Sequence, residues 1–525
     1  MRPARSQVPR PALRFSSVTD VRSNAELTEA SARGVRWVSI ARVVGELLML
    51  GSMVLLARLI PPSAFGMFAI AVIVQELATT IPSEGVGTAL VQRRSIGREH
   101  LQAALALALL IGTALAGLAL VAAAVVVDPL FGPETATLVA VSTSFFLFGA
   151  LAAPATAVLR RSLDFRRLSI LDVTNTIVRS STSVALATVA GLDASALVLG
   201  ALAGVAAMCV LALAFAPLPP PRWHRGAVKD LLPYGGPASF ACVCWAGFRN
   251  GDYAIVGAKL GAASAGVYWR AFQLAVEYQR KISVVMTSVA MPVLARTAGS
   301  DELFALRGRM VRLLAMIVFP LLVGLVILAP VVVPFVFGPA WEAAVLPTQL
   351  LAGAGAATVV IDAVGTVFMA TGRSRALLGF GVAHFVVYVG VVLVAANWGI
   401  TGVAIASSGV HLVFVAVAYR ILLHGRPEKP LRLLWADTSA AVVSCAAMAA
   451  AATPVAIALE RSDTPAVAQI VIVGAVGGAV YLAALRLWFK AAWLDLSALL
   501  HRVLPDRLTR RRAAKDPALA ARSIV

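Results

Sequence analysis

The stretch ARLIPPSAFGMFAI, residues 57–70, decides the fold because two prolines and a glycine interrupt a long apolar run there. A proline has no amide hydrogen to donate within a helix, and it disfavours helix at the residue before it. Pro61 and Pro62 therefore predict that one apolar helix ends and another begins. Gly66 and Phe68 belong to the returning helix. The stretch predicts a tight corner between two consecutive helices.

The composition of the whole chain indicates an integral membrane protein. Of its 525 residues, 60% are hydrophobic and 14% are charged, whereas soluble domains carry about 25% charged residues. A helix needs about 20 mostly apolar residues to cross a bilayer, and the chain contains fourteen such runs. The expected spans are Val35–Leu59, Ala64–Ile81, Leu101–Val127, Thr135–Leu159, Leu168–Ala190, Ala194–Ala216, Leu231–Val256, Gly266–Leu294, Leu303–Ala329, Ala344–Ala370, Ala376–Ala396, Ile400–Leu422, Trp435–Leu459 and Val467–Leu487.

The net charge of +19 reflects basic loops between these runs. Loops after even-numbered runs are rich in Arg and Lys, while loops after odd-numbered runs carry only Lys259 and Arg461, with Arg58 at a helix end. Such alternation marks membrane orientation, which argues against a nucleic-acid partner and places both termini in the cytoplasm. The basic segment RLTRRRAAK, residues 507–515, is expected to contact anionic membrane lipids.

The corner recurs in the second half of the chain as AKLGAASAGVYWRA, residues 258–271. Gly66 and Gly266 are 200 residues apart, and Gly132 in LFGPE and Gly338 in VFGPAWE are 206 apart. This offset spans six runs, an even number, so the second copy keeps the orientation of the first. We expect an all-α fold with two parallel six-helix bundles, related by a pseudo-two-fold axis along the membrane normal, and a cleft between them.

These repeats define the expected domains. Two helices at the C-terminal end have no counterpart in either repeat. The expected parts are a disordered basic tail (1–33), the first six-helix bundle (34–216), a cytoplasmic linker (217–230), the second bundle (231–424), two additional helices (425–490) and a basic cytoplasmic tail (491–525).

Several ionisable residues lie inside the apolar runs, where each costs about 2.5–3.5 kcal/mol on insertion scales. Such residues tend to face a wet cavity or a partner. The candidate cavity arginines are Arg42, Arg179, Arg249 and Arg270, and the candidates for ion coupling or pairing are Glu46, Glu76, Asp252, Glu277 and Asp362. The alternative is local pairing within a helix, as for Arg42 with Glu46 or Arg249 with Asp252. For His384 and His411, hydrogen bonding between helices is favoured over proton relay.

The arginines favour an anionic substrate, because a guanidinium binds phosphate oxygens in a planar fork and keeps its charge. The chain has no phosphate-binding GxxxxGK[ST] loop, no HExxH and no Gly-rich dinucleotide turn. We therefore expect no cofactor, no metal site and no catalytic residues. The outer loops are short, which makes a membrane polymerase or ligase less favoured. A transporter with alternating access fits the two bundles better.

At this point the chain resembles the Wzx-type polysaccharide transport flippases, within the multidrug/oligosaccharidyl-lipid/polysaccharide exporter superfamily. The resemblance rests on LLARLIPPSAFGMFAIAVIVQELATTIPSEGVGTALVQRR, residues 55–94, and on Arg249, Asp252, Gly257, Leu260, Gly261, Gly266 and Tyr268 in the second half. It departs from the family pattern after Tyr268, where Trp269 and Arg270 follow.

The resemblance implies a flippase of the bacterial inner membrane. Its substrate would be an undecaprenyl-pyrophosphate-linked oligosaccharide, moved from the cytoplasmic to the outer leaflet for polysaccharide, capsule or O-antigen assembly. Polysaccharide polymerase or export machinery is a further implied partner. Two alternatives remain open at this stage, a multidrug or cation antiporter of the same superfamily and a peptidoglycan-precursor flippase.

Overall fold

The computed structural model describes residues 44–503, except for 94, 298–300, 425–426 and 463. All regular secondary structure in these residues is helical. Nine segments of the described chain are long and apolar enough to cross a membrane, so this is a multi-pass membrane protein. The expected tail 1–33, the candidate Arg42 and the end of the C-terminal tail lie outside the described residues.

The helices follow one another with short connections. Residues 44–59 are helical and lead into the first half of the chain. There the elements are α2 (Pro62–Pro82), η1 (Ser83–Gly87), α3 (Thr88–Gln92), α4 (Arg98–Ala122), η2 (Ala123–Val127), α5 (Asp128–Phe131), α6 (Pro133–Ser142), α7 (Phe145–Arg161), α8 (Phe165–Val189) and α9 (Ala194–Phe215).

The second half begins with a long bent helix. Its elements are α10 (Arg225–Phe272), η3 (Gln273–Glu277), α11 (Tyr278–Arg296), α12 (Asp301–Phe337), η4 (Pro339–Ala344), α13 (Val345–Ala370), α14 (Ser374–Ala395), η5 (Ala396–Trp398), α15 (Gly399–Leu422), α16 (Pro430–Arg461), α17 (Ala466–Trp488) and α18 (Lys490–Val503). Here η1, η2 and η3 are π-helical turns, and such turns are frequent at functional sites.

The expected apolar runs fall on helical residues wherever the chain is described, apart from run ends and the turn at Thr143 and Ser144 within the fourth run. The nine strongly apolar segments do not include α8, α10 or α11, and one of the nine covers both α14 and α15. The three helices left out carry Arg179, Arg249 and Arg280. Three of the helices that carry arginines of the site are thus less apolar than the nine segments.

Both predicted corners are present. In the first, Pro61 has an extended backbone and α2 starts at Pro62. In the second, α10 is interrupted at Gly261, whose φ of 85° and ψ of 169° are not helical. Only glycine adopts a positive φ of this kind without strain, so Gly261 makes the turn that two prolines make in the first corner.

The two corners pack directly against each other. A Cβ atom built on Gly66 would lie 2.8 Å from the backbone nitrogen of Gly266, and closer still to the carbonyl oxygen of Ala262. A Cβ on Gly266 would lie 2.9 Å from the nitrogen of Gly66, and closer still to the carbonyl oxygen of Pro62. The contact is reciprocal, and it admits no side chain at either glycine.

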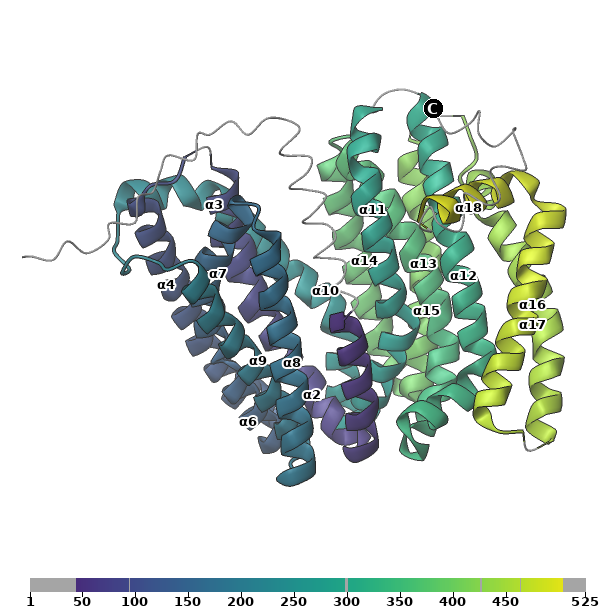
Figure 1. Cartoon of the computed structure of the whole chain (residues 1–525), viewed down its shortest axis with the longest axis horizontal. Coiled ribbons are helices and arrows are strands. Elements are labelled where there is room, and N and C mark those ends of the chain that lie inside the picture. The colour runs from purple at the N-terminus through teal and green to yellow at the C-terminus, as the bar shows by residue number, and fades with distance from the viewer. Residues whose placement is uncertain (1–43, 94, 298–300, 425–426, 463, 504–525) are drawn as a thin grey trace, which may run out of the picture.

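Figure 1 shows α4 and α6–α9 on one side of the molecule and α11–α15 on the other, with α16 and α17 along the far edge. Helices α2 and α10 lie in the centre and make the most extensive helix–helix contact in the described chain. The main apolar core runs through this contact into α12, α13 and α15.

One expectation about the C-terminal tail needs correction. Residues from 491 onward were expected to form a tail, but α18 packs Ala492 and Leu496 into an apolar cluster with α12, α16 and α17. Arg307, near the start of the expected span Leu303–Ala329, is 1% exposed within α12. It donates hydrogen bonds to Asp437 and to Tyr419 Oη, the latter at 3.2 Å, and so joins α16 to α15 and α12. The sequence pattern around Arg307 did not indicate that Asp437 is its partner.

Candidate functional site

Five charged side chains form a continuous row where the two halves of the chain meet. Arg249 on α10 holds Glu76 of α2 at 3.0 Å with one terminal nitrogen and Glu277 of η3 at 3.5 Å with the other. Arg280 on α11 lies 3.6 Å from Glu277 and 3.9 Å from Asp362 of α13. We call Glu76, Arg249, Glu277, Arg280 and Asp362 the charged row.

The charged row is partly open to its surroundings. The exposed fractions of its side chains range from 19% for Arg280 to 36% for Arg249. Asn250 adds a hydrogen bond from its amide nitrogen to Glu76 at 3.0 Å. Ion pairs that are open to their surroundings stabilise a protein by only about 0–1 kcal/mol. The partly exposed row is therefore poorly suited to a purely structural role. Its groups remain available for exchange with a ligand.

A second ion pair lies beside the row. Lys281, which follows Arg280 on α11, donates to both carboxylate oxygens of Glu46 at 2.7 and 2.9 Å. The pair ties helix 44–59 to the second half of the chain. Tyr278 supports this contact with a hydrogen bond to the sulfur of Met53 at 3.2 Å.

Arg179 on α8 differs from the two arginines of the row because no carboxylate in the described residues lies within ion-pair distance of it. Its guanidinium lies 5.9 Å from the ring centre of Phe68 on α2, and the residue is exposed. The stem of Arg179 packs against Gly204 of α9. Arg179 is therefore a cation in the first half of the chain that is available to an anion.

Asp252 does not pair with Arg249, so the local pair considered from the sequence is not formed. Instead Asp252 is 1% exposed and accepts hydrogen bonds from Tyr268 at 2.9 Å and Tyr388 at 2.8 Å. The backbone nitrogen of Tyr253 donates a third bond at 2.9 Å. The two neighbours separate because Arg249 points toward α2 while Asp252 points into the second half.

Arg270 lies away from the row, in the contact between the two corners. It has no exposed surface, and four aromatic rings surround its guanidinium at 4.7–5.7 Å, those of Phe65, Trp269, Phe337 and Trp341. Desolvated cation–π contacts of this kind are worth about 2 kcal/mol each. In this conformation Arg270 faces aromatic rings and no site that a phosphate can reach.

The same contact is closed by hydrogen bonds across the two halves. The indole nitrogen of Trp341, which is fully buried, donates to the Ala57 carbonyl oxygen at 2.8 Å. Arg58 donates from its Nε to the carbonyl of Val336 at 3.1 Å and from a terminal nitrogen to that of Phe335. Arg58 thus satisfies carbonyls that the end of α12 leaves free. We call Phe65, Gly66, Gly266, Arg270 and Trp341 the junction.

The two histidines pack in the second half. His411 on α15 bonds through Nδ1 to the Ser407 carbonyl at 2.7 Å, within its own helix. Its ring lies 4.9 Å from that of His384 on α14. Tyr388 joins this group through Ser407 Oγ at 3.2 Å. The two rings pack against each other between the helices, and the hydrogen bond of His411 to Ser407 lies within its own helix.

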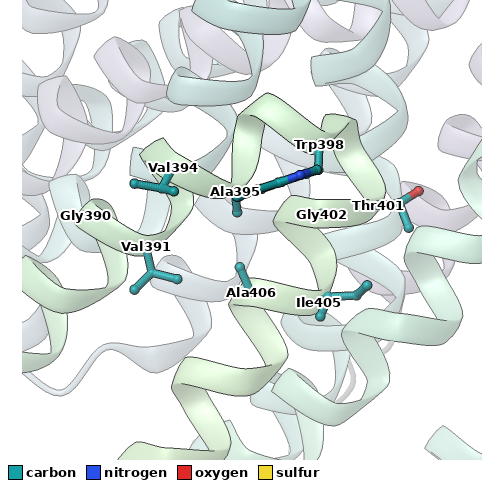
Figure 2. A pocket seen from close by; sticks show the side chains of 9 residues that line it. All are labelled: Gly390, Val391, Val394, Ala395, Trp398, Thr401, Gly402, Ile405 and Ala406. Atoms are coloured by element: carbon teal, nitrogen blue, oxygen red, sulfur yellow. The ribbon is translucent and has the colours of Figure 1, made fainter.

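A separate hollow lies between α14 and α15 near their connection (Figure 2). It has a volume of about 680 Å³, and its lining is almost wholly aliphatic apart from Trp398 and Thr401. Trp398 is 70% exposed and Ile405 is 57% exposed. Exposed apolar side chains of this kind are typical of a lipid-facing surface. The lining of the hollow includes none of the charged residues of the row.

The structure thus brings together four of the residues selected from the sequence, Glu76, Arg249, Glu277 and Asp362. Arg179 stands apart on α8, Glu46 pairs with Lys281, and Asp252 and Arg270 are buried elsewhere. Arg280 and Asn250 were missed as site residues. Arg280 follows Arg270 and Glu277 along one apolar run, a signal that could have identified it.

Comparisons with known proteins give the same picture. Residues 55–346 match the family model described as polysaccharide biosynthesis protein. The chain is 24% identical over 404 residues to the lipopolysaccharide biosynthesis protein WzxC of Escherichia coli (strain K12), covering 76% of this chain and 82% of WzxC. It is 25% identical over 357 residues to the teichuronic acid biosynthesis protein TuaB of Bacillus subtilis (strain 168), covering 66% of this chain and 73% of TuaB.

Solved structures show which fold this is. The lipid II flippase MurJ, in an inward closed conformation, superposes with a TM-score of 0.71 at 15% identity, over 86% of this chain and 99% of MurJ. An inward-facing multidrug resistance MATE family transporter of the MOP superfamily gives 0.57 at 16% identity, over 77% of this chain and 98% of that chain. The chain therefore shares the fold of these two structures. Since the family model covers more than half of its length, the chain belongs to the polysaccharide biosynthesis protein family.

Proposed function

We propose that this protein is a flippase for a lipid-linked, pyrophosphate-bearing oligosaccharide, which it moves from the cytoplasmic to the outer leaflet by alternating access. The observation that carries the proposal is the charged row, which joins α2 of the first half to α10, η3, α11 and α13 of the second. The family supports a role in polysaccharide assembly, and the MOP-superfamily fold supports transport.

The proposal includes fourteen spanning helices in two six-helix bundles with a pseudo-two-fold axis, plus two further helices. The reciprocal contact of Gly66 and Gly266 supports it, because a two-fold axis relates such pairs of contacts. Gly132 and Gly338, which the repeat pairs, also share a backbone conformation, with φ of 87° and 102° and ψ of 164° and 165°. The proposed location is the bacterial inner membrane with both termini in the cytoplasm, as the basic loops favour.

The arginines would receive the pyrophosphate by exchange. A phosphate oxyanion presents the same geometry to a guanidinium fork as a carboxylate does. A pyrophosphate bound at Arg249 would therefore displace Glu76 and Glu277 from it. That exchange removes an ion pair that joins the two halves and leaves them free to move. The isoprenoid tail would stay in the bilayer throughout.

An inside-negative membrane potential favours the proposed direction. Moving two negative charges outward across the membrane releases about 4–5 kcal/mol per 100 mV, provided that the arginines do not move with them. The released carboxylates Glu76 and Glu277 are candidates for coupling to a cation. Glu46 and Asp362 keep their own basic neighbours, Lys281 and Arg280.

The test is a flipping assay in proteoliposomes, with lipid-linked oligosaccharide extracted from the source membranes and an impermeant reagent that modifies the outer-leaflet pool. We expect Arg179→Ala and Arg249→Ala to slow flipping about tenfold or more, the loss of a charge-assisted hydrogen bond. Lysine variants should recover part of the rate, since they keep charge without the fork. Arg461→Ala, at the exposed end of α16, is the matched control.

Wild-type rates for both alanine variants, at equal protein content, would contradict the proposal.

Two rival substrates are included in the same assay. The first rival is a cationic drug, because the four carboxylates that pair with the basic side chains are also suited to binding a cation. The second is lipid II, because the fold is shared with a lipid II flippase. Transport of a lipophilic cation, or of lipid II in preference to the extracted oligosaccharide, would move the assignment to that substrate.

A further inference from the structure

A cavity of about 350 Å³ with both polar and apolar walls lies within the first half of the chain, between α2, η1, α7, α8 and α9. Its size falls within the range of small-ligand pockets, about 300–1,000 Å³. It is separate from the hollow of Figure 2, whose walls are aliphatic. The polar residues that line it are Thr79, Ser83, Thr156, Arg160, Ser169 and Asp172.

Ser169 is the member that points to a missing ligand. It is 5% exposed, and its hydroxyl has no hydrogen-bond partner among the described residues. A buried hydroxyl without a partner costs about 1–3 kcal/mol, and buried polar groups in native proteins are nearly always paired. An orphaned hydroxyl that lines a cavity is therefore a group held ready for a partner that enters the cavity.

The other polar residues of the lining fit a ligand that both donates and accepts hydrogen bonds. The hydroxyls of Thr79 and Thr156 donate to helix carbonyls, Gln75 and Ala153 respectively, both at 3.0 Å, so each keeps lone pairs that can accept. Arg160 adds donors and Asp172 adds acceptors, and both are exposed, which places the mouth of the cavity beside them. Phe165 supplies an aromatic wall.

This combination matches a sugar ring better than the other parts of the proposed substrate. A sugar has hydroxyls that donate and accept, and a C–H face that packs on an aromatic ring. An isoprenoid chain would leave the polar walls unpaired, at a cost. A phosphate group would meet Arg160 but would also be repelled by the carboxylate of Asp172.

The cavity lies next to the proposed phosphate-binding groups. On α2, Glu76, Thr79 and Ser83 follow at i, i+3 and i+7, so the wall of the cavity continues the face that carries the row. On α8, Asp172 and Arg179 are seven residues apart on one face, which is about 10 Å along the helix. A sugar close to the pyrophosphate can span that distance.

We propose that this cavity is a saccharide subsite, which binds a sugar residue of the lipid-linked oligosaccharide near its pyrophosphate. The inference rests on the proposed flippase function. It assigns the recognition of the saccharide to α2, α7 and α8 of the first half alone. Arg249 and Arg179 then bind the phosphates regardless of which saccharide is attached.

The test measures binding to the purified full-length protein of two probes, the extracted lipid-linked oligosaccharide and the same lipid after its saccharide has been removed. We expect Ser169→Ala to weaken binding of the saccharide-bearing form about three- to tenfold, and Asp172→Asn about tenfold or more. The sugar-free form should bind both variants as it binds the wild type. Ser181→Ala on an exposed part of α8 and Asp193→Asn before α9 are matched controls.

Thermal unfolding separates a binding role from a structural one. Because the Ser169 hydroxyl has no partner in the described part of the chain, Ser169→Ala should leave the unfolding temperature of the ligand-free protein unchanged or higher. Equal weakening of both probes by the two variants, or equal affinity of the wild type for both, would overturn the subsite while the flippase function stands. Failure of the wild type to bind either probe would overturn the function itself.

Discussion

The junction and the charged row both join the two halves of the molecule, but they do so by opposite means. In the junction, backbone meets backbone at Gly66 and Gly266, and Arg270 and Trp341 have no exposed surface. In the row, the contacts are side-chain ion pairs at 3.0–3.9 Å, and the groups are partly exposed. Close packing without water makes a contact strong, while exposed ion pairs are weak and exchangeable.

The difference indicates a separate role for each region in a transporter. The junction holds one end of the two halves together in this conformation. The row is where a charged ligand can compete with the ion pairs. Variants in the junction should therefore change stability most, and variants in the row should change transport with little loss of stability.

The largest effect on stability is expected for Trp341→Ala. It removes a fully buried ring that contacts Phe65 and Arg270, together with the hydrogen bond to the Ala57 carbonyl. Burial of this kind is worth about 3–5 kcal/mol. Trp398→Ala is the control, because that ring is 70% exposed. Thermal unfolding in detergent measures both, and similar small shifts for the two variants would remove the distinction between the regions.

A smaller but substantial effect is expected for Gly66→Ala. Its Cβ would collide with the backbone of Ala262 and Gly266, which cannot move aside as a side chain would. The expected cost is about 1–3 kcal/mol, the usual range for overpacking. Gly409→Ala on α15 meets nothing within 4 Å and should stabilise the protein by about 0.5–1 kcal/mol. Equal unfolding temperatures for the two alanine variants would contradict the backbone contact.

The smallest effect is expected at the ion pair of Lys281 and Glu46, whose side chains are 37% and 36% exposed. Reversing either charge, as Lys281→Glu or Glu46→Lys, should cost about 0.2–1 kcal/mol. The double variant should recover most of that loss, and a double-mutant cycle measures the coupling. A coupling of several kcal/mol would show that this pair behaves like the junction.

Much of the fold could be predicted from local patterns. Proline, glycine and apolar length act within a few residues, so the corners at Pro61 and Gly261 and the helices between them followed from the sequence. Helix α18 was missed because its Trp493 and Leu496 pack on helices that precede it by many residues. The ion pair of Arg307 could not be predicted because its partner Asp437 is 130 residues away along the chain.

The residues of the candidate site could be selected from the sequence, but the ion pairs that they form came from the structure. The sequence alone indicated that Glu76, Arg249, Glu277 and Asp362 were buried in membrane spans, because ionisable residues there are rare and costly. Their partners could not be read from helical spacing, since each ion pair of Arg249 joins different elements. For the same reason nothing local indicated that Arg270 would face four aromatic rings.

The sequence by itself determined that this is a helical membrane protein with recurring corners and charges inside its spans. Hydrophobic length and backbone restrictions are local properties, and they suffice for those features. The tertiary structure decided which arginine is paired, which is enclosed and which, like Arg179, has no carboxylate partner among the described residues. Those outcomes depend on side chains from distant helices, because charge is satisfied by whatever lies within a few ångströms in space.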